Sequence, residues 1–158
     1  MRRKDKEVTD LNLIHAVIYQ AEVCRLALVD GEKPYLIPLS FGFDGTHIYI
    51  HSAANGRKIE LLKANNQVCV EFEQFEGILP NDNPCNWSAR YFTVIGSGQA
   101  ELLVDNAEQN YGLNQIIRHY SPEAVERMFT EQELAKLRVY KIKPTELTGK
   151  VSGMKQTL

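Results

Sequence analysis

The sequence lacks the features that mark several protein classes. Its three cysteines, Cys24, Cys69 and Cys85, lie far apart with no CxxC pair, which argues against a zinc clip or a disulfide framework. No apolar run is long enough to cross a membrane, and the charged opening MRRKDKE is unlike a signal peptide. We therefore expect a cytoplasmic protein that makes no contact with a membrane.

A strong charge of one sign is also missing. The 18 basic and 20 acidic residues nearly cancel, so no overall positive field would attract nucleic acid. The acidic residues Glu71, Glu73 and Glu76 have no histidine at metal-ligand spacing, and we expect them to form a solvated strand face without a metal. The length of 158 residues predicts a single domain over 1–158.

Short apolar segments separated by turn signals predict an antiparallel sheet. Asp30-Gly31 and Asp44-Gly45 supply tight turns, and the first strands are too close together in sequence for a parallel crossover. The last strand is expected to end before Pro144. The expected strands cover 24–29, 35–43, 46–52, 68–74, 89–103 and 139–143.

Helices are expected where apolar residues recur every three to four positions. Thr9 is the expected N-cap of a helix over 10–20, and Asp105 with Glu108 fits a capping box for a helix that reaches Tyr120. Shorter helical pieces are expected over 57–63, after Ser121-Pro122 and after the pair Thr130 and Glu133, with an irregular loop over 76–88. This order predicts a mainly β fold, a closed or partly closed antiparallel barrel with flanking helices.

The segment Pro34 to Lys58, PYLIPLSFGFDGTHIYIHSAANGRK, carries the strongest functional signal. Pro38 cannot donate a ladder hydrogen bond, so it belongs at a sheet edge or bulge, where neighbouring backbone groups are free to bind a ligand. Arg57 and Lys58 follow where a strand gives way to a helix, and a helix start with two cations suits a phosphate. A ligand that fits both features has a flat polar ring at one end and a phosphate at the other. Flavin mononucleotide (FMN) is such a ligand. The alternative is a solvated first helical turn.

Several short motifs occur in an order that resembles the pyridoxamine 5'-phosphate oxidase-like, FMN-binding split-barrel family, most closely its nitroimidazole-resistance (NimA-like) branch. The motifs are MRRKDKE at the start, AEVCRLA at 21–27, PLSFGFDG, HSA...GRK, PCNW at 84–87 and the strand 91–98. The resemblance covers most of the chain, to about residue 150. It implies a split antiparallel β-barrel and a homodimer with two flavin sites in the clefts between the subunits.

The resemblance also implies which residues contact the cofactor. The isoalloxazine edge would meet the backbone around Ile37, Pro38, Leu39 and Ser40. The ribityl phosphate would face His51, Ser52, Arg57 and Lys58. The strand that crosses beneath the flavin, often from the partner subunit, would contribute Arg90 and Thr93.

Two residues of the expected loop stay open to different interpretations. Trp87, the single tryptophan, either stacks on a flat ligand or anchors the loop to the core as a large apolar side chain. Cys85 lies in the same polar loop, where no basic activator for a catalytic thiolate is evident from the sequence.

The resemblance implies an FMN-dependent oxidoreductase of small molecules, with a nitroaromatic such as a 5-nitroimidazole as candidate substrate and NAD(P)H as candidate electron donor. The flavin carries the electron transfer, so no side chain is assigned as a general base. A non-catalytic flavin-binding redox sensor or carrier is the alternative function. FAD is the alternative cofactor, and a deazaflavin or haem variant of the same barrel is also open.

Overall fold

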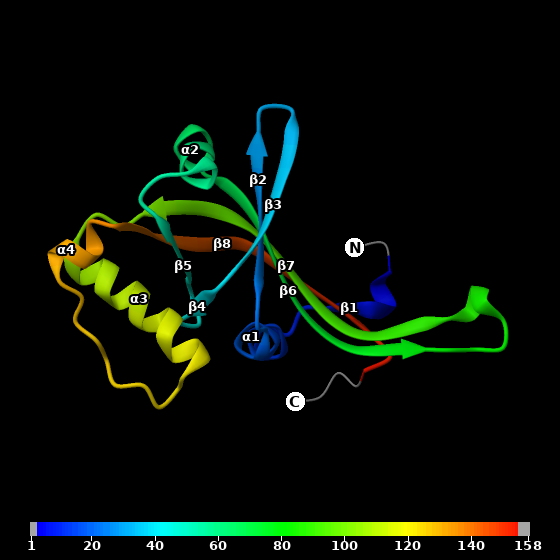
Figure 1. Ribbon diagram of the computed structural model, residues 1–158. Coiled ribbons are helices and arrows are strands. Elements are labelled where there is room, and N and C mark those ends of the chain that lie inside the picture. The colour runs from blue at the N-terminus through cyan, green and yellow to red at the C-terminus, as the bar shows by residue number, and fades with distance from the viewer. Residues whose placement is uncertain (1–2, 155–158) are drawn as a thin grey trace.

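The computed structural model describes residues 3–154, which form one antiparallel sheet with flanking helices (Figure 1). The strands are β1 (Glu7–Val8), β2 (Cys24–Asp30), β3 (Lys33–Leu39), β4 (Phe41–Phe43), β5 (Ile48–Ala53), β6 (Gln67–Leu79), β7 (Ser88–Leu102) and β8 (Leu137–Ser152). The helices are α1 (Leu11–Gln20), α2 (Arg57–Ala64), α3 (Asn106–Tyr120) and α4 (Glu131–Leu134), with 3-10 turns η1 (Lys4–Lys6) and η2 (Pro84–Asn86). Within these residues, none of the helices combines the length and apolar character that a membrane span requires.

The strand order shows how the sheet becomes a barrel. The order is β3-β2-β6-β7-β8-β5-β4, and β1 pairs with β8. β3 and β4 lie at opposite ends of this order, although only Ser40 separates them in the chain. The sheet therefore curls until its two ends approach each other, which confirms the predicted split antiparallel barrel. The prediction of one continuous strand over 35–43 is wrong, because the chain leaves one end of the sheet and enters the other at Ser40.

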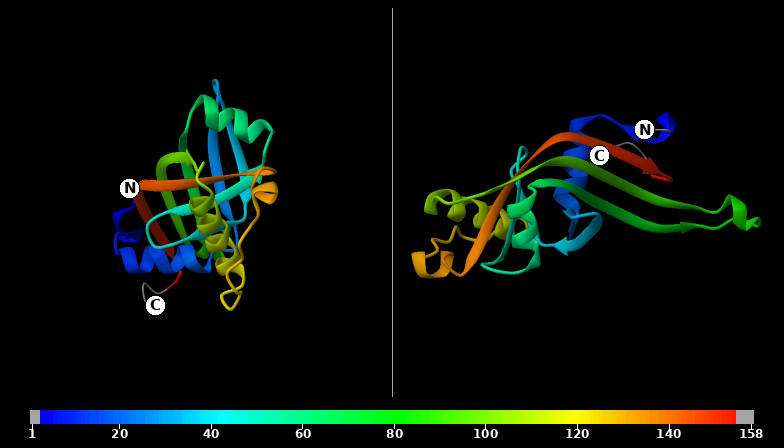
Figure 2. Two further views of the ribbon diagram at one scale, coloured as in Figure 1. Left: turned by 90° about the vertical axis from the view of Figure 1, so that its left-hand side faces the viewer. Right: turned by 90° about the horizontal axis from the view of Figure 1, so that it is seen from above.

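The larger apolar cluster fills the barrel. Phe41, Phe72 and Leu26 are fully buried there, and their strands come from distant parts of the chain. α1 lies across the bottom of the barrel in the left view of Figure 2 and inserts Ile14 and Ile18 into the same cluster. The three-to-four spacing of the apolar residues of α1 thus covers the open end of the barrel, as an amphipathic helix does.

α3 packs against β4 and β5 through a second apolar cluster. Tyr49 of β5 lies there with Leu113 and Ile116 of α3. The approach is closest at Gly42, where an added Cβ would overlap the backbone of Gln115. Any larger residue at position 42 would push α3 away from the sheet, because helix backbone cannot yield as a flexible side chain can.

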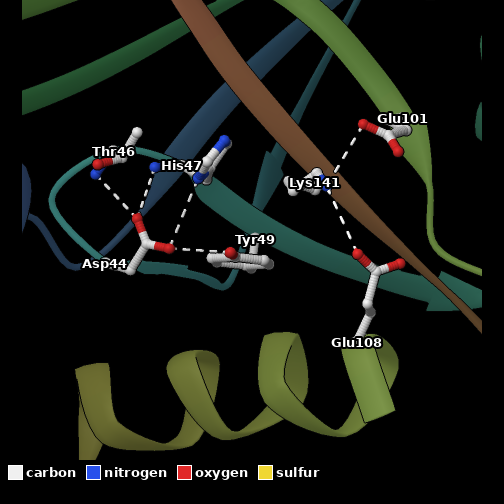
Figure 3. Close-up of polar contacts among 7 residues, drawn as sticks. All are labelled: Asp44, Thr46, His47, Tyr49, Glu101, Glu108 and Lys141. Atoms are coloured by element: carbon white, nitrogen blue, oxygen red, sulfur yellow. Dashed lines mark hydrogen bonds and ion pairs between the residues drawn. The ribbon is translucent and has the colours of Figure 1, made fainter. Parts of the chain in front are cut away.

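The Asp44-Gly45 turn before β5 is confirmed, and its side chains show why it is stable (Figure 3). Asp44 Oδ1 accepts hydrogen bonds from the backbone amides of Thr46 at 2.8 Å and His47 at 2.6 Å. The hydroxyl of Tyr49 donates to Asp44 Oδ2 at 2.9 Å. Partial burial alone would raise the pKa of Asp44, but these donors outweigh it and lower the pKa below its usual value.

Helix caps differ in part from those predicted. α1 is capped by Asp10, whose carboxylate accepts from the amide of Asn12, so the expectation for Thr9 is wrong by one residue. Asp105 caps α3 as predicted. Glu108 does not complete a capping box there, because its carboxylate lies 3.8 Å from Lys141 Nζ of β8 (Figure 3). This ion pair connects α3 to the sheet.

β6 and β7 form a long hairpin that projects from the barrel (Figures 1 and 2). The predicted loop over 76–88 is wrong in its bounds, because β6 continues to Leu79 and β7 begins at Ser88. A register shift between Phe75 and Gly77, with Gly77 at φ 118°, lets the ladder continue beyond the acidic stretch. We call residues 75–91 the arm.

No helix follows Ser121-Pro122, contrary to the prediction. Two buried asparagines of α3 hold this irregular stretch instead. Asn114 Oδ1 accepts from the amide of Arg127 at 2.9 Å, and Asn110 Oδ1 accepts from the amide of Phe129 at 2.7 Å. The side-chain amides thus replace the backbone partners that a helix would have supplied.

The two remaining predictions near the C-terminus have opposite outcomes. The capping box of Thr130 and Glu133 is confirmed at the start of α4. The expected end of the last strand at Pro144 is wrong, because β8 runs through it to Ser152. The register shifts between Ser97 and Gly98, and Pro144 pairs with Gly98, so this irregularity lies where a residue without an N–H would interrupt the ladder.

Candidate functional site

The start of α2 holds the two cations that the sequence singles out. β5 ends at Ala53, and the helix begins at Arg57 after Gly56, whose φ of 136° favours glycine. No side chain caps this helix start. The first amides of α2, Arg57 and Lys58 therefore lie together on a short connection, with the positive end of the helix dipole available to an anion.

Arg57 is bound to the β2–β3 hairpin. Its guanidinium forms an ion pair with Asp30, in which both Nε, at 3.2 Å, and Nη2 donate to the same carboxylate oxygen. The guanidinium carbon also lies 4.5 Å from the centroid of the Tyr35 ring. The side chain is nevertheless 58% exposed, so these contacts orient the cation without removing it from solvent.

Lys58 has no such partner. Its ammonium donates to the backbone carbonyl of His51 at 3.2 Å, and among residues 3–154 no carboxylate lies within ion-pair distance of it. Burial of the side chain lowers the pKa of Lys58, because desolvation disfavours the charged form. Partial burial of a cation without an anion is costly, and a negatively charged ligand would offset this cost.

His51 and Ser52 lie side by side on β5 but point to opposite faces of the sheet. His51 pairs with Val139, and its pKa is lowered first by burial and then by the charge of Lys58. Ser52 pairs with Arg138 across the ladder, so these two side chains share a face. The structure therefore places His51 with Lys58 and places Ser52 with a different cation.

Arg138 was missed by sequence reasoning. It is half-buried, and its Nη1 donates to the carbonyl of its neighbour Leu137 at 2.7 Å. Ser52 and Arg138 are far apart in the sequence, and only the pairing of β5 with β8 brings them together. No local pattern at position 138 could have shown this proximity.

The residues predicted to meet the flavin ring lie where β3 ends. β3 has β2 as its single neighbour in the sheet, so the prediction that Pro38 lies at a sheet edge is confirmed. Ile37 and Leu39 turn inward and pack against the barrel core, whereas Pro38 and Ser40 are exposed. The second edge of β3 therefore offers backbone groups, as the proposed contact with a ring requires.

Arg90 and Thr93 lie on β7 but on opposite faces, as their odd spacing dictates. Thr93 lines a hollow of about 280 Å³ on the face turned away from the barrel core. We call this face of β6, β7 and β8 the outer face. The other side chains that line the hollow are Glu73, Tyr91, Ile95, Thr148 and Lys150.

The outer face is charged as well as apolar. Glu73 and Glu76 are exposed, as expected for a solvated strand face, and Arg25 Nη1 of β2 lies 2.7 Å from Glu71 Oε2 and 3.8 Å from Glu73 Oε2. Lys150 lies 5.3 Å from the centroid of the Tyr91 ring. Both signs of charge and several apolar groups are thus within reach of a ligand or a second protein chain.

The tip of the arm does not pack on the core. Trp87 is 54% exposed, and its indole donates to the carbonyl of Asn81 at 2.7 Å, so an anchor in the barrel core is the wrong interpretation. Cys85 is also exposed. Residues 3–154 contain no cluster of side chains suited to a metal ion.

The two groups of predicted residues are separated within one chain. The start of α2 lies at the upper left of Figure 1, whereas the arm projects to the right, beyond the barrel. The structure therefore brings Arg57, Lys58 and His51 together at the start of α2, whereas Arg90 lies in the arm and Thr93 lines a hollow to which α2 contributes no residue.

Comparisons with known proteins agree with this architecture. The family profile described as pyridoxamine 5'-phosphate oxidase matches residues 10–151. A structure of a candidate 5-nitroimidazole antibiotic resistance protein from Bacteroides thetaiotaomicron is 31% identical, covers 92% of this chain and 86% of its own, and has a TM-score of 0.80.

Two further structures share the fold at lower identity. The flavocytochrome Anf3 from Azotobacter vinelandii has a TM-score of 0.87 at 20% identity, over 98% of this chain and 72% of its own. An FAD- and haem-binding protein from Mycobacterium smegmatis has a TM-score of 0.86 at 22% identity, over 94% and 74%. An uncharacterised protein of Rhizobium meliloti is 27% identical over 59 residues, which span 37% of this chain and 38% of that protein.

Proposed function

The chain belongs to the pyridoxamine 5'-phosphate oxidase family, and on that premise we propose that it binds FMN and acts as an oxidoreductase of small molecules. The observation that carries the proposal is Lys58, a half-buried cation at an uncapped helix start with no carboxylate partner in the described part of the chain. A phosphate would supply the missing charge. The FAD named for two of the structural neighbours adds support for a flavin.

The phosphate of FMN would be held at the start of α2. Lys58 and Arg57 provide charge, and the first amides of the helix provide hydrogen-bond donors. The neighbouring His51 is biased towards the neutral form, because burial and Lys58 lower its pKa, and the neutral ring keeps one N–H that can donate to a phosphate oxygen. These residues fit a phosphate with close to two negative charges.

The isoalloxazine ring would lie along the free edge of β3. The backbone from Ile37 to Ser40 offers hydrogen-bonding groups there, since β3 pairs with β2 on its other side. Pro38 keeps this stretch from joining another strand fully, because it has no N–H. When bound, the flavin supplies the electron transfer, and the chain binds it, orients it and limits the access of water.

The second wall of the site would come from a second copy of the chain. Thr93 and the hollow beside it lie away from α2 within one chain, so a cofactor that contacts both needs two subunits. The outer face carries Arg25, Glu71 and Glu73, and acids and bases on one patch allow it to face its own copy. Exposed Ile95 and Phe75 add apolar area to this homodimer interface.

A small flat molecule is the proposed substrate, and a nitroaromatic is the leading candidate. The hollow of about 280 Å³ suits one ring rather than an extended molecule. The 31% identity to a candidate 5-nitroimidazole resistance protein points to the same chemistry. The electrons would be supplied by NADH or NADPH.

The test begins with the purified full chain. Native mass spectrometry gives the subunit count and the mass of any retained cofactor, and absorbance separates flavin from haem. Titration of stripped, folded protein with FMN, FAD and riboflavin is expected to give the tightest binding for FMN. A folded protein that binds none of the three would overturn the proposal.

Turnover distinguishes the reductase from a redox carrier. We expect the flavin-loaded protein to be reduced by NADH or NADPH in a stopped-flow experiment and to be reoxidised by a nitroimidazole over many cycles. A carrier would exchange electrons once per bound flavin and then stop. Absence of multiple turnovers with a panel of nitroaromatics would therefore refute the enzymatic part alone.

A further inference from the structure

Arg57 already donates to an anion within its own chain. Nε and Nη2 of its guanidinium both donate to Oδ2 of Asp30. These two donors form one of the edges with which a guanidinium takes a carboxylate or a phosphate in parallel hydrogen bonds. The Tyr35 ring, 4.5 Å from the guanidinium carbon, fixes the plane in which this edge lies.

The two partners of Arg57 come from one hairpin. Asp30 ends β2 and Tyr35 belongs to β3, so the β2–β3 hairpin holds the side chain from one side. Arg57 itself is the first residue of α2, next to the helix amides proposed to bind phosphate. The same guanidinium thus lies between a fixed carboxylate and the phosphate site.

We infer that Asp30 competes with the cofactor phosphate for Arg57, an inference that rests on the proposed function. The ion pair is exposed, with Arg57 58% and Asp30 33% accessible, and exposed pairs are weak enough to exchange. A phosphate at the start of α2 has Lys58 and the helix amides as additional partners, which Asp30 lacks. The phosphate therefore displaces Asp30 from the Arg57 guanidinium, and the competition with Asp30 lowers the affinity for the phosphate.

Asp30 acts in this account as a specificity residue. A weak or singly charged anion gains too little from Arg57 to displace a tethered carboxylate, whereas a phosphate monoester gains more. The carboxylate also keeps the bound cofactor exchangeable, because it is ready to receive Arg57 when the phosphate leaves. Asp30 contacts no reacting atom, and its influence acts through Arg57.

The experiment is a double-mutant cycle measured with two ligands. Wild type, Asp30→Asn, Arg57→Ala and the double variant are titrated with FMN and with riboflavin, which lacks the phosphate. We expect Asp30→Asn to tighten FMN binding about two- to fivefold and to leave riboflavin binding unchanged. The gain in FMN affinity should be lost when Arg57 is already alanine.

Several outcomes would overturn the competition. Unchanged or weaker FMN binding by Asp30→Asn would mean that Asp30 is a bystander or orients Arg57 for the phosphate. An equal gain for riboflavin, or a gain that persists with Arg57→Ala, would mean that the charge of Asp30 acts without Arg57. Glu126→Gln is the matched control, because it neutralises the acid of another exposed arginine pair, Arg118–Glu126, and should change neither affinity.

Failure of the proposed function has a separate signature. In that case no flavin binds to any of the folded variants, and inorganic phosphate becomes the probe. Titration of phosphate into wild type and Asp30→Asn, followed by the NMR signal of the Arg57 Nε–H group, then decides the inference alone. A larger response in Asp30→Asn supports the competition, and equal or absent responses refute it.

Discussion

The start of α2 and the outer face with its arm form opposite halves of the proposed site, and they differ in what their own chain provides. At α2 the polar groups have fixed neighbours: Arg57 is held by Asp30, and Lys58 donates to His51. On the arm, Phe75 and Trp87 leave more than half of their surface exposed. Contacts within one chain form the first half, whereas the second half is proposed to need a second copy of the chain.

The largest expected effect comes from a substitution on the outer face of β7, the strand that begins in the arm. Ile95 is 47% exposed on the outer face, so Ile95→Glu should leave the monomer folded but place an unpaired carboxylate in the proposed interface. We expect monomers by native mass spectrometry and a loss of FMN affinity of roughly 100-fold or more. Val104→Glu is the control, because Val104 is 79% exposed and lies beyond the end of β7, outside the outer face. A dimeric Ile95→Glu protein that still binds FMN would show that the outer face is not the interface.

The next largest effect is expected from a substitution of Lys58 at the start of α2. Lys58→Met keeps the apolar stem and removes the charge, which should weaken FMN binding about 10- to 150-fold, as the loss of a charged hydrogen bond of about 1.5–3 kcal/mol predicts. The thermal midpoint of the cofactor-free protein should rise, because a desolvated cation is removed.

The matched control for this change is Lys63→Met, since Lys63 is exposed on the same helix and lies 3.8 Å from Glu60. It should leave FMN affinity unaltered in titrations. If both lysine variants bind FMN as wild type does, the phosphate site does not lie at the start of α2.

Arg57 should contribute less than Lys58, because it must leave Asp30 before it can bind phosphate. We expect Arg57→Ala to weaken FMN binding about tenfold in equilibrium titrations. Arg57→Lys should restore part of this affinity, since it keeps the charge but loses the planar arrangement of donors. Unchanged affinity in the alanine variant would support the alternative that Arg57 is only a solvated part of the first turn.

The smallest expected effect is the pH dependence contributed by His51. Burial and Lys58 lower its folded-state pKa, whereas the unfolded chain titrates near the usual value of about 6.5. The unfolded state therefore binds protons first, and the free energy of unfolding should fall as pH drops from about 6.5 through the folded pKa. Denaturant melts of wild type and His51→Gln over this range should diverge. Parallel curves would mean that His51 titrates alike in both states.

The chemistry of neighbouring residues was enough to predict much of the half of the site formed by the end of β3 and the start of α2. The edge position of Pro38 follows from its missing N–H, and the helix start at Arg57 follows from the apolar spacing of the residues behind it. The alternation over 68–74, now part of β6, is equally local. The split barrel was implied by the family resemblance, whereas the turn signals predicted only the hairpins that became β2–β3 and β4–β5.

Contacts between distant residues could not be predicted. The pairs Asp30–Arg57 and Ser52–Arg138 exist because of the β2–β3 hairpin and the β5–β8 register, which no short motif specifies. The prolines and asparagines near the tip of the arm predict a loop, whereas the bulge at Gly77 lets the ladder continue past the acidic stretch. The positions of Arg90 and Thr93 relative to a flavin depend on a second chain and stay predictions.

The paired amides of Asn110 and Asn114 have a consequence for the order in which the molecule opens. The stretch between α3 and α4 has few ladder bonds of its own, yet the backbone amides of Arg127 and Phe129 are held by side chains of α3. Their hydrogens should therefore exchange with solvent only when α3 itself loosens, although neither lies in a helix or strand. The irregular stretch between α3 and α4 is in this way kinetically coupled to α3.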